Sequence, residues 1–578
     1  MMRLANFRPT PALLALCALA LWAAALSAAE PRVKLAPNGA VLVDGKPFLP
    51  IFVWAQPSSA LEMHKALGVN TMHPGEKEES DPIKAYLDKL QANGMLALVN
   101  DGAYKDEIKG HPAILAWTVE HEPDGATPAP YKPNLAGDGS IIWIEGEGPK
   151  ENTLKPAGGW LNLKSAQLSG EHWLTCDDKA EGQAVYEFEV KKAGKYNLWV
   201  REFTKTWANP TNWQIDDQPA QDTPRELRSV NEESANLGEG RGANWCKYAT
   251  VDLTEGKHKL TIKVVPGRTV GDPKKEPAPA AIWAIDVFCF TTADKFPPRV
   301  VADPLPTRLP EVEKEHYEQM KKRDPNCLTW NIFSGSFFGP YSQGLPQKYY
   351  DEWLRWADIA SFDLYPVTGW NQPGRLAHVG LATRKLVSMA RKGQPVWTIV
   401  EASDQELSWT APTTKGPTAE EMRAEVWMAI ASGAKGIGYF TIAFGRGKSF
   451  KWNNLTDEVK AEMKRTNGEL TELAAPILLG DTDKALTTSG DETKDKEAQG
   501  HAIMAIRKDY EGKTYVVAVN VTREPVRPMF KVEEAPGGSV EVFRENRKVE
   551  LKDAVELKNP SFTDAFKPLE VHIYILSK

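Results

Sequence analysis

Cysteine, excess basic charge and long apolar runs are all scarce in this sequence. Its 578 residues include only 5 cysteines, which excludes a small disulfide scaffold. Acidic residues outnumber basic ones, 77 to 70, so no basic face is implied and nucleic acid is not an expected partner. No CxxC or HExxH spacing occurs, which removes the common zinc motifs. Beyond the N-terminus no apolar run reaches the roughly 18 residues of a membrane span.

The first 29 residues have the order of an export signal. Arg3 and Arg8 precede an apolar stretch, residues 12–26, and small residues follow as far as Ala29. A positive, then apolar, then small-residue order is typical of a secretory signal, here with cleavage near Ala29. We therefore expect an exported protein, secreted or periplasmic.

Apolar, strand-like runs alternate with helical segments in two parts of the chain. Eight such runs, each followed by a helix, predict a (β/α)8 barrel. The runs are almost continuously apolar, as expected for parallel strands that are covered on both faces. The clearest helix, residues 418–432, begins with a capping box formed by Thr418 and Glu421 and stops at Gly433. The predicted strands are residues 49–54, 69–73, 95–100, 114–120, 327–332, 359–364, 395–400 and 436–441.

A long segment interrupts this alternation after the fourth strand. It consists of short alternating runs separated by turns such as Gly194-Lys195, which predicts an antiparallel β-sandwich. Cys176 and Cys246 lie in it and could form a disulfide in an oxidising compartment. The end of the chain also consists of short strands. The predicted protein is therefore multidomain α/β: a signal peptide (1–29), a barrel (30–136 and 297–478), an inserted β-sandwich (137–296) and a C-terminal β-sandwich (479–578).

Two glutamates stand at predicted strand ends, where barrels of this type carry their functional side chains. Glu122 follows the fourth strand and Glu401 follows the seventh. Alone, either glutamate would be read as part of a surface salt bridge. Cleavage of a glycosidic bond needs one carboxyl group that keeps its proton and one that is ionised, so the pair favours a glycoside hydrolase. Other strand-end residues are candidate sugar contacts: Trp54, His73, Asn100, Asp101, His121, Trp330 and Asn331.

These strand ends resemble those of clan A retaining glycoside hydrolases. Residues 111–124 (HPAILAWTVEHEPD) resemble the fourth-strand motif, in which an Asn-Glu-Pro-like end carries the acid/base. Residues 395–401 (PVWTIVE) resemble the seventh strand, which carries the nucleophile. Residues 363–366 (DLYP) are similar to the sixth-strand end, where a tyrosine often contacts the nucleophile, and residues 421–440 resemble the last helix and strand of galactosidase-like members.

The resemblance implies roles for three residues. Glu122 would be the acid/base, Glu401 the nucleophile and Tyr365 the hydrogen-bond partner of that nucleophile, with no cofactor for catalysis. His121 departs from the motif, because the clan usually has asparagine there. Glu120 is a rival acid that, on a regular strand, would point to the same side as Glu122. Two alternatives stay open: a catalytically inactive barrel that binds polysaccharide, and an inverting or lyase-like use of the carboxylates.

The inserted segment resembles carbohydrate-binding modules of families 6 and 35. Residues 144–147 (IEGE), 194–201 (GKYNLWVR) and 284–287 (AIDV) resemble the opening, central and closing strands of such modules. The resemblance implies a structural calcium held by oxygen ligands from Glu145, Glu147 and Asp286. Candidate sugar-stacking residues are Trp173, Trp207, Trp213 and Trp245. The expected partner of the protein is a poly- or oligosaccharide; its oligomeric state is not predicted.

Overall fold

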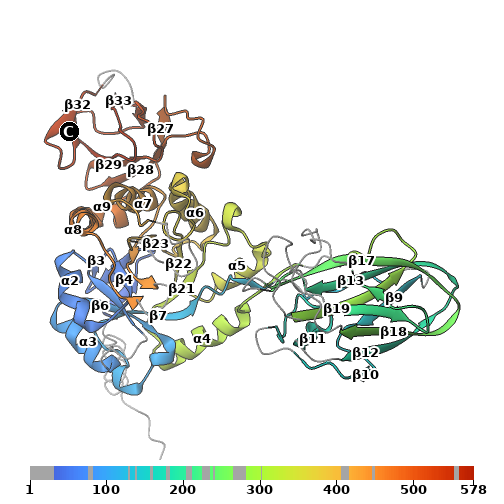
Figure 1. The fold of residues 1–578 in the computed structure, drawn as a ribbon. Helices are drawn as coiled ribbons and strands as arrows, with labels where there is room; N and C mark the ends of the chain where they lie inside the picture. Colours follow the sequence, from blue (N-terminus) through green and yellow to red (C-terminus); the bar gives the residue numbers. More distant parts are fainter. Residues whose placement is uncertain are drawn as a thin grey trace, which may run out of the picture. The chain divides into compact units, whose positions relative to one another are not determined.

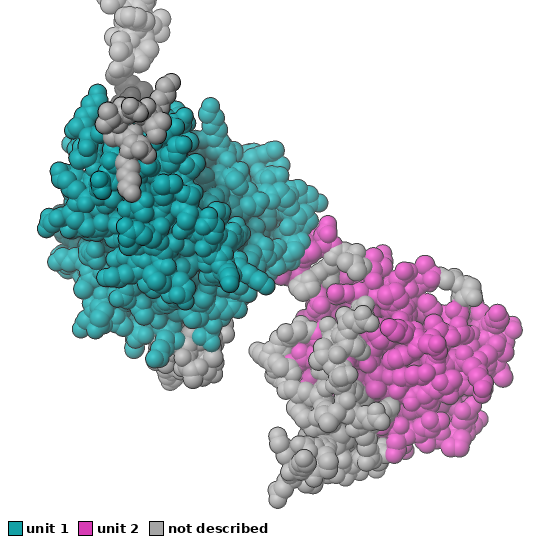
Figure 2. All heavy atoms as spheres, turned by 90° about the horizontal axis from the view of Figure 1, so that it is seen from above, with its two compact units in different colours: residues 1–125, 306–578 teal, residues 126–305 magenta. Residues whose placement is uncertain are grey.

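The computed structural model divides the chain into two compact units, Met1–Gly125 with Pro306–Lys578, and Ala126–Leu305 (Figure 2). The predicted signal peptide lies outside the described residues. In the described part, no helix is both long and apolar enough to cross a membrane. The structure describes residues 31–75, 82–127, 130–136, 140–156, 161–177, 182–203, 211–223, 235–237, 241–264, 282–300, 303–404, 415–444, 450–551 and 559–578.

A closed barrel of eight parallel strands forms the centre of the first unit, which confirms the predicted fold (Figure 1). Seven of the eight pairings join barrel strands that follow one another along the chain, including β7 with β21 across the insertion, and the eighth joins β24 to β4 and closes the barrel. The insertion therefore follows the fourth barrel strand, as expected. The barrel strands are β4 (Ile51–Gln56), β5 (Thr71–Pro74), β6 (Leu96–Asn100), β7 (Ile114–His121), β21 (Thr329–Phe333), β22 (Ile359–Asp363), β23 (Val396–Glu401) and β24 (Ile437–Phe440).

Helices follow the strands along the chain. The predicted capping box is present at the start of α7, where the Glu421 amide donates to Thr418 Oγ1 (3.2 Å) and the Thr418 amide donates to Glu421 Oε2 (2.8 Å). Two of the four amides that a helix start leaves unpaired are satisfied in this way. The helices of this unit are α2 (Leu61–Ala66), α3 (Ile83–Ala92), α4 (Pro310–Arg323), α5 (Gln347–Trp353), α6 (Ala377–Met389), α7 (Ala419–Ala431), α8 (Asp457–Glu472) and α9 (Ala474–Leu479).

Large aromatic side chains fill the barrel interior. Phe52 meets the Trp330 ring edge-on at 5.4 Å, and Trp330 lies 5.8 Å from Trp397. A three-stranded sheet that the sequence did not predict packs against this core, with Val41 fully buried. Its strands are β1 (Val33–Leu35), β2 (Val41–Val43) and β3 (Lys46–Pro47). The barrel is thus a packed core with no central channel, as is usual for this fold.

The second unit is a β-sandwich of two antiparallel sheets around one apolar core. One sheet has the order β10-β12-β18-β14-β15; the other has the order β11-β19-β13-β17-β16, with β9 also pairing to β19. The strands are β9 (Ile141–Glu145), β10 (Glu151–Asn152), β11 (Leu174–Asp177), β12 (Gln183–Val190), β13 (Gly194–Phe203), β14 (Thr211–Ile215), β15 (Gln221–Asp222), β16 (Ala235–Asn236), β17 (Gly242–Leu253), β18 (Gly256–Val264) and β19 (Ile282–Thr291). Two short strands, β8 (Ala126–Thr127) and β20 (Leu305–Pro306), pair where the chain leaves and re-enters the barrel.

The suggested disulfide does not form, since Cys176 and Cys246 are not bonded to each other. Cys176 lies on β11 and Cys246 on β17, and two strands separate β11 from β17 in the sheet. Three steps of about 4.8 Å put the two strands roughly 14 Å apart, too far for a disulfide.

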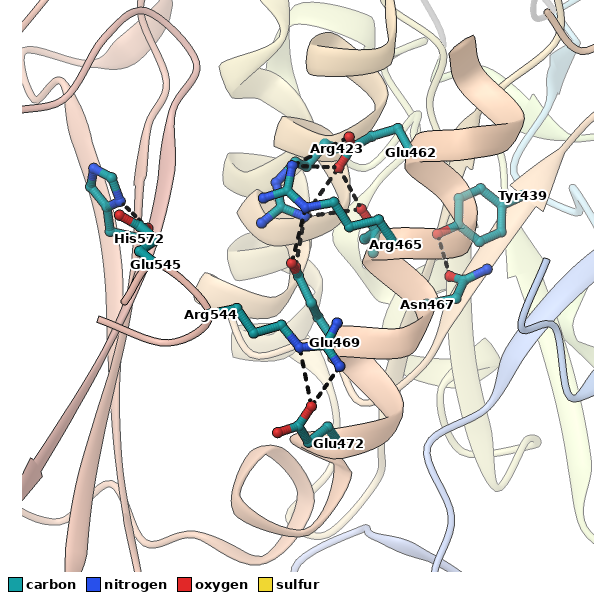
Figure 3. A network of polar contacts seen from close by, with 11 residues as sticks. Arg423, Tyr439, Glu462, Arg465, Asn467, Glu469, Glu472, Arg544, Glu545 and His572 are labelled. Carbon is teal, nitrogen blue, oxygen red and sulfur yellow. Dashed lines mark hydrogen bonds and ion pairs between the residues drawn. The ribbon is translucent and has the colours of Figure 1, made fainter. Parts of the chain in front are cut away.

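A second, smaller sandwich ends the chain and packs on the barrel helices. Arg523 donates to Glu421 of α7, and Arg544 forms an ion pair of 2.6 Å with Glu472 of α8 (Figure 3). Its strands are β27 (Leu486–Ser489), β28 (Ile503–Tyr510), β29 (Lys513–Asn520), β30 (Met529–Val532), β31 (Ser539–Val542), β32 (Arg547–Val549), β33 (Ser561–Thr563) and β34 (Val571–Ser577). They form two sheets, β27-β30-β33 and β28-β29-β34-β31-β32.

Candidate active site

A cavity of about 450 Å³ opens where the barrel strands end. This size lies within the usual range for small-ligand sites. Strands β4, β7, β22, β23 and β24 contribute to its walls, together with the loops that follow β21 and β22. It is lined by Trp54, His121, Glu122, Ser334, Ser336, Tyr341, Gln343, Asp363, Leu364, Tyr365, Gly369, Trp370, Ile399 and Phe440.

Glu122 reaches this cavity because the chain bends at the end of β7. The pairing of β7 with β21 shifts by one residue just before Glu120, and Glu122 itself has a positive φ of 49°. Its amide donates to the carbonyl of Ile332 at 2.7 Å, which ties the bend to β21. A positive φ is unfavourable for a residue with a side chain, and such strain is concentrated at functional sites.

Because of this bend, the side chains of Glu120 and Glu122 lie in different surroundings. On a regular strand both would point to the same side. Glu120 Oε1 lies 3.6 Å from the Arg308 guanidinium, and Glu120 is not among the lining residues. Burial raises the pKa of Glu120, and the charge of Arg308 opposes that rise. Glu120 is therefore a buried partner of an arginine, and Glu122 is the acid of this motif that lines the cavity.

Trp54 forms an aromatic wall between two histidines. Its ring stacks on His73 at 3.9 Å and on His121 at 4.9 Å. His73 Nε2 is 3.0 Å from Asn100 Oδ1, and burial lowers the pKa of His73 to about 3, so this ring is neutral. Trp54 and His121 line the cavity, whereas His73 stacks on the Trp54 ring and is not among the lining residues.

A second acid, Asp363, lines the cavity at the end of β22. Asp363 Oδ1 is buried and has no hydrogen-bond partner among the described residues. Burial raises the pKa of Asp363 well above its usual range, and the charge of Glu122 raises it further. The cavity thus holds two carboxyl groups, and the charge of Glu122 favours the protonated form of Asp363.

Glu401 is buried and is not among the lining residues. Its Oε1 accepts the Val367 amide at 2.6 Å, and its Oε2 accepts the Thr368 amide. Burial raises the pKa of Glu401 to about 7, against the opposing effect of these amides. The neighbouring Glu425 of α7 is fully buried, and its pKa lies well above its usual range because of burial and the charge of Glu401. Among the described residues, the hydrogen bonds of Glu401 come from the Val367 and Thr368 amides and not from Tyr365, whose ring lies 4.9 Å from that of Phe440.

The structure places four other predicted sugar contacts away from the cavity. Trp330 belongs to the barrel interior, and its Nε1 donates to Ser361 Oγ at 2.7 Å. Asn331 is fully buried and donates to Glu313 of α4 at 2.8 Å. Asn100 contacts His73, and Asp101 lies 3.2 Å from His316. Alternation along a strand explains the first two, because neighbouring residues point to opposite sides of the barrel wall.

Sequence reasoning missed the lining residues that come from loops. Tyr341 and Trp370 follow β21 and β22, and their rings are 5.2 Å apart. The Tyr341 hydroxyl lies 3.1 Å from His378 Nδ1, and His378 Nε2 lies 2.7 Å from Glu497 of the C-terminal sandwich. Loops have no repeating pattern that would show which side chains face a ligand.

Two of the three predicted calcium ligands in the second unit, Asp286 and Glu145, have partners within the protein. Asp286 Oδ2 accepts Arg201 Nη1 at 2.5 Å, and its Oδ1 accepts the Ser169 amide at 2.9 Å. Glu145 Oε1 accepts Ser169 Oγ at 2.8 Å, and only Glu145 Oε2 is buried without a partner. No metal-binding group of three or more His, Cys, Asp or Glu occurs in the described ranges. Arg201 already supplies a positive charge beside Asp286, and the charge of Glu145 raises the pKa values of both Glu147 and Asp286. A calcium ion at Glu145, Glu147 and Asp286 therefore stays a prediction.

The candidate stacking tryptophans of the second unit are core residues where they are described. Trp173, Trp213 and Trp245 are at most 4% exposed, so none presents a ring face to a ligand. Trp207 lies outside the described residues.

Comparison with solved structures finds matches of low sequence identity. An α-amylase from Geobacillus thermoleovorans is 13% identical, with 47% of this chain and 58% of that chain covered and a TM-score of 0.30. Gan42B, a GH42 β-galactosidase from G. stearothermophilus, solved as a catalytic mutant, is 11% identical, with 46% and 66% covered and a TM-score of 0.33. CBM35 of Abf62 from Cellvibrio japonicus is 12% identical, with 28% and 99% covered and a TM-score of 0.19. This chain spans less than two thirds of the first two structures.

A family model gives the more specific result. No curated protein matches the chain. Residues 307–478 match the family model Glyco_hydro_42, described as Beta-galactosidase; the match includes Asp363 and Glu401, and it begins well after Glu122 in the chain. The predicted resemblance to galactosidase-like barrel glycoside hydrolases is therefore confirmed over residues 307–478.

Proposed function

We propose that this protein is an exported glycoside hydrolase that cleaves O-glycosidic bonds of a poly- or oligosaccharide in the barrel cavity. The observation that carries the proposal is that two carboxyl groups, Glu122 and Asp363, line one cavity walled by aromatic rings. Flat aromatic faces such as Trp54 and Trp370 suit the apolar faces of sugar rings. The family match, described as Beta-galactosidase, makes β-galactosides the first substrates to test.

A retaining mechanism needs only two carboxyl groups and water. One carboxylate attacks the anomeric carbon while a carboxylic acid protonates the leaving oxygen. The second group, now ionised, then takes a proton from water, and the water oxygen displaces the first carboxylate. No cofactor takes part in this scheme. In the role that the resemblance assigns to it, Glu401 would have to leave the amides of Val367 and Thr368.

The test is a screen of aryl glycosides and polysaccharides with product analysis. We expect the full chain to hydrolyse at least one substrate with retention of configuration. The Glu122→Gln variant should lose activity by about 100-fold or more, because it removes an ionisable group from the reacting centre. Glu458→Gln, on the exposed side of α8, is the matched control and should keep full activity.

A catalytically inactive barrel that binds polysaccharide is the second candidate. The buried, amide-bonded state of Glu401 favours it, because one predicted catalytic group does not line the cavity. Binding of a polysaccharide without any product across the panel would support this candidate and contradict the first.

A further inference from the structure

The C-terminal sandwich is linked to the wall of the barrel cavity through a short segment, η7 (Lys496–Ala498). Its Glu497 Oε2 lies 2.7 Å from His378 Nε2, and His378 Nδ1 lies 3.1 Å from the hydroxyl of Tyr341, which lines the cavity. The three residues come from separate parts of the chain, since η7 follows β27, His378 is on α6 and Tyr341 is in the loop after β21. They form one chain of polar contacts from the sandwich to the cavity.

Local structure holds the members of this chain of contacts in place. The Asp495 side chain accepts the Glu497 amide at 3.0 Å, which fixes the start of η7. His378 stands in the first turn of α6, and its ring meets those of Phe338 and Tyr341 edge-on, with centroids 5.4 and 5.6 Å away. Because His378 is only 3% exposed, its ring has little room to turn.

The sandwich also packs closely on α6, the helix that carries His378. A side chain at Gly380 would collide with Met504 of β28, so this glycine allows the two elements to approach. Arg375 Nε lies 3.4 Å from Glu497 Oε1 and adds a second contact. The pairing of Glu497 with His378 is therefore part of a packed interface.

The direction of the hydrogen bonds follows from the protonation of His378. Burial lowers the pKa of His378, so its ring is neutral near neutral pH and has one donor and one acceptor nitrogen. The Glu497 carboxylate can only accept, which makes Nε2 the donor nitrogen and leaves Nδ1 as the acceptor. The Tyr341 hydroxyl therefore donates to His378 Nδ1, and this bond holds the Tyr341 ring in one orientation.

We propose that Tyr341 and Trp370 bind a sugar ring of the substrate, and that Glu497, through His378, fixes the Tyr341 ring for this contact. The inference rests on the proposed hydrolase function and deepens it. The Tyr341 and Trp370 rings lie 5.2 Å apart, and Trp370 is 49% exposed although it lines the cavity, so a broad aromatic surface is available to a sugar. His378 and Glu497 are positioning residues. The C-terminal sandwich thereby acts on substrate affinity without touching the substrate.

The experiment measures kcat and KM of the full chain on p-nitrophenyl β-D-galactoside, or on the aryl glycoside that the wild type hydrolyses best. Tyr341→Phe keeps the ring and removes one hydrogen bond, so KM should rise about three- to tenfold with kcat within about twofold of wild type. Glu497→Ala should raise KM by a similar factor. Glu497→Gln should restore most of the affinity, because its carbonyl oxygen still accepts from His378 Nε2.

A double variant separates positioning from a general structural role. Tyr341→Phe combined with Glu497→Ala should have the KM of Tyr341→Phe alone, because the link to Tyr341 is already broken. Glu541→Ala is the matched control and should keep the wild-type KM, since Glu541 belongs to the same sandwich and pairs with the exposed Lys548. Circular dichroism and thermal unfolding establish that each variant is folded, and His378→Phe replaces Glu497→Ala if the latter does not fold.

Three results overturn the inference alone. They are a folded Glu497→Ala variant with the wild-type KM, a rise in KM that adds to that of Tyr341→Phe in the double variant, and a fall in kcat with no change in KM. A wild type that hydrolyses no glycoside overturns the proposed function and, with it, this inference.

Discussion

Acidic side chains are buried in two parts of the barrel unit, and they are neutralised in different ways. In the network between α7 and α8, Glu469 is 2% exposed and accepts Arg423 Nη1 at 2.7 Å (Figure 3). Arg423 also contacts Glu462 at 3.3 Å. At the barrel mouth, the half-buried Asp363 and the buried Glu401 and Glu425 have no arginine or lysine among the contacts that the described structure gives them.

Helix α7 contributes one charged residue to each of these two regions. Arg423 and Glu425 are two residues apart on α7, which places them about 200° apart around the helix axis. Arg423 faces the glutamates of α8, and Glu425 faces Glu401 of β23. Paired charges hold helices together, whereas unpaired buried acids keep protons and have raised pKa values. The second condition is the one that acid–base chemistry needs.

The largest expected effect comes from breaking the paired region. Arg423→Leu leaves Glu469 buried with only Arg465 as a partner, and we expect a loss of about 3 kcal/mol in the free energy of unfolding. Urea unfolding followed by tryptophan fluorescence measures it. Arg465→Leu is the control, because Arg465 is 56% exposed and its ion pairs should contribute less than about 1 kcal/mol. Equal losses of unfolding free energy in Arg423→Leu and Arg465→Leu would show that the buried ion pair contributes no more than the exposed one.

We expect the free energy of unfolding to depend on pH through the acids at the barrel mouth, which have no basic partner. The folded state raises the pKa of Glu401 from 4.5 to about 7, so it binds more protons than the unfolded state between these values. Glu401 therefore lowers stability as the pH rises through this window, by about 2 kcal/mol between pH 5 and pH 7. In the Glu401→Gln variant, we expect the free energy of unfolding, measured with urea, to fall less steeply over the same pH range. An unchanged slope would mean that Glu401 is ionised throughout.

The smallest expected effect concerns backbone strain at Glu122. Glycine tolerates the φ of 49° without a steric cost, so Glu122→Gly should raise the free energy of unfolding by up to about 1 kcal/mol while activity is lost. Glu122→Gln keeps the strained backbone and should leave stability unchanged. Thermal unfolding of both variants checks this, and a destabilised glycine variant would show that Glu122 supports the fold.

Much of the fold was predictable because burial leaves a local pattern. The run at residues 395–400 predicted β23 to within a residue or two, since a strand covered on both faces is apolar throughout. Thr418 and Glu421 predicted the start of α7, because a capping box is a local device. The sheet formed by β1, β2 and β3 was missed, since its strands are only two or three residues long.

The candidate site was predictable only in part. Glu122 and Trp54 were expected at strand ends, and both line the cavity. Trp330 was expected there as well, but it lies below the cavity in the packed interior. Tyr341 and Trp370 could not be foreseen, because their place depends on how two loops fold over the strand ends.

The sequence by itself determined a barrel with an inserted and a C-terminal sandwich, and it determined that acids stand at the strand ends. Hydrophobic period, helix caps and turn residues act between near neighbours, and so they can be read from the chain. Only the tertiary structure decided which acids share the cavity. A shifted pairing near Glu120 and the positive φ of Glu122 direct Glu122 to the cavity that Asp363 also lines, whereas two amides hold Glu401 outside its lining. The placing of Glu122 depends on contacts between residues more than 200 positions apart, such as the Glu122 amide with the Ile332 carbonyl, which no local pattern records.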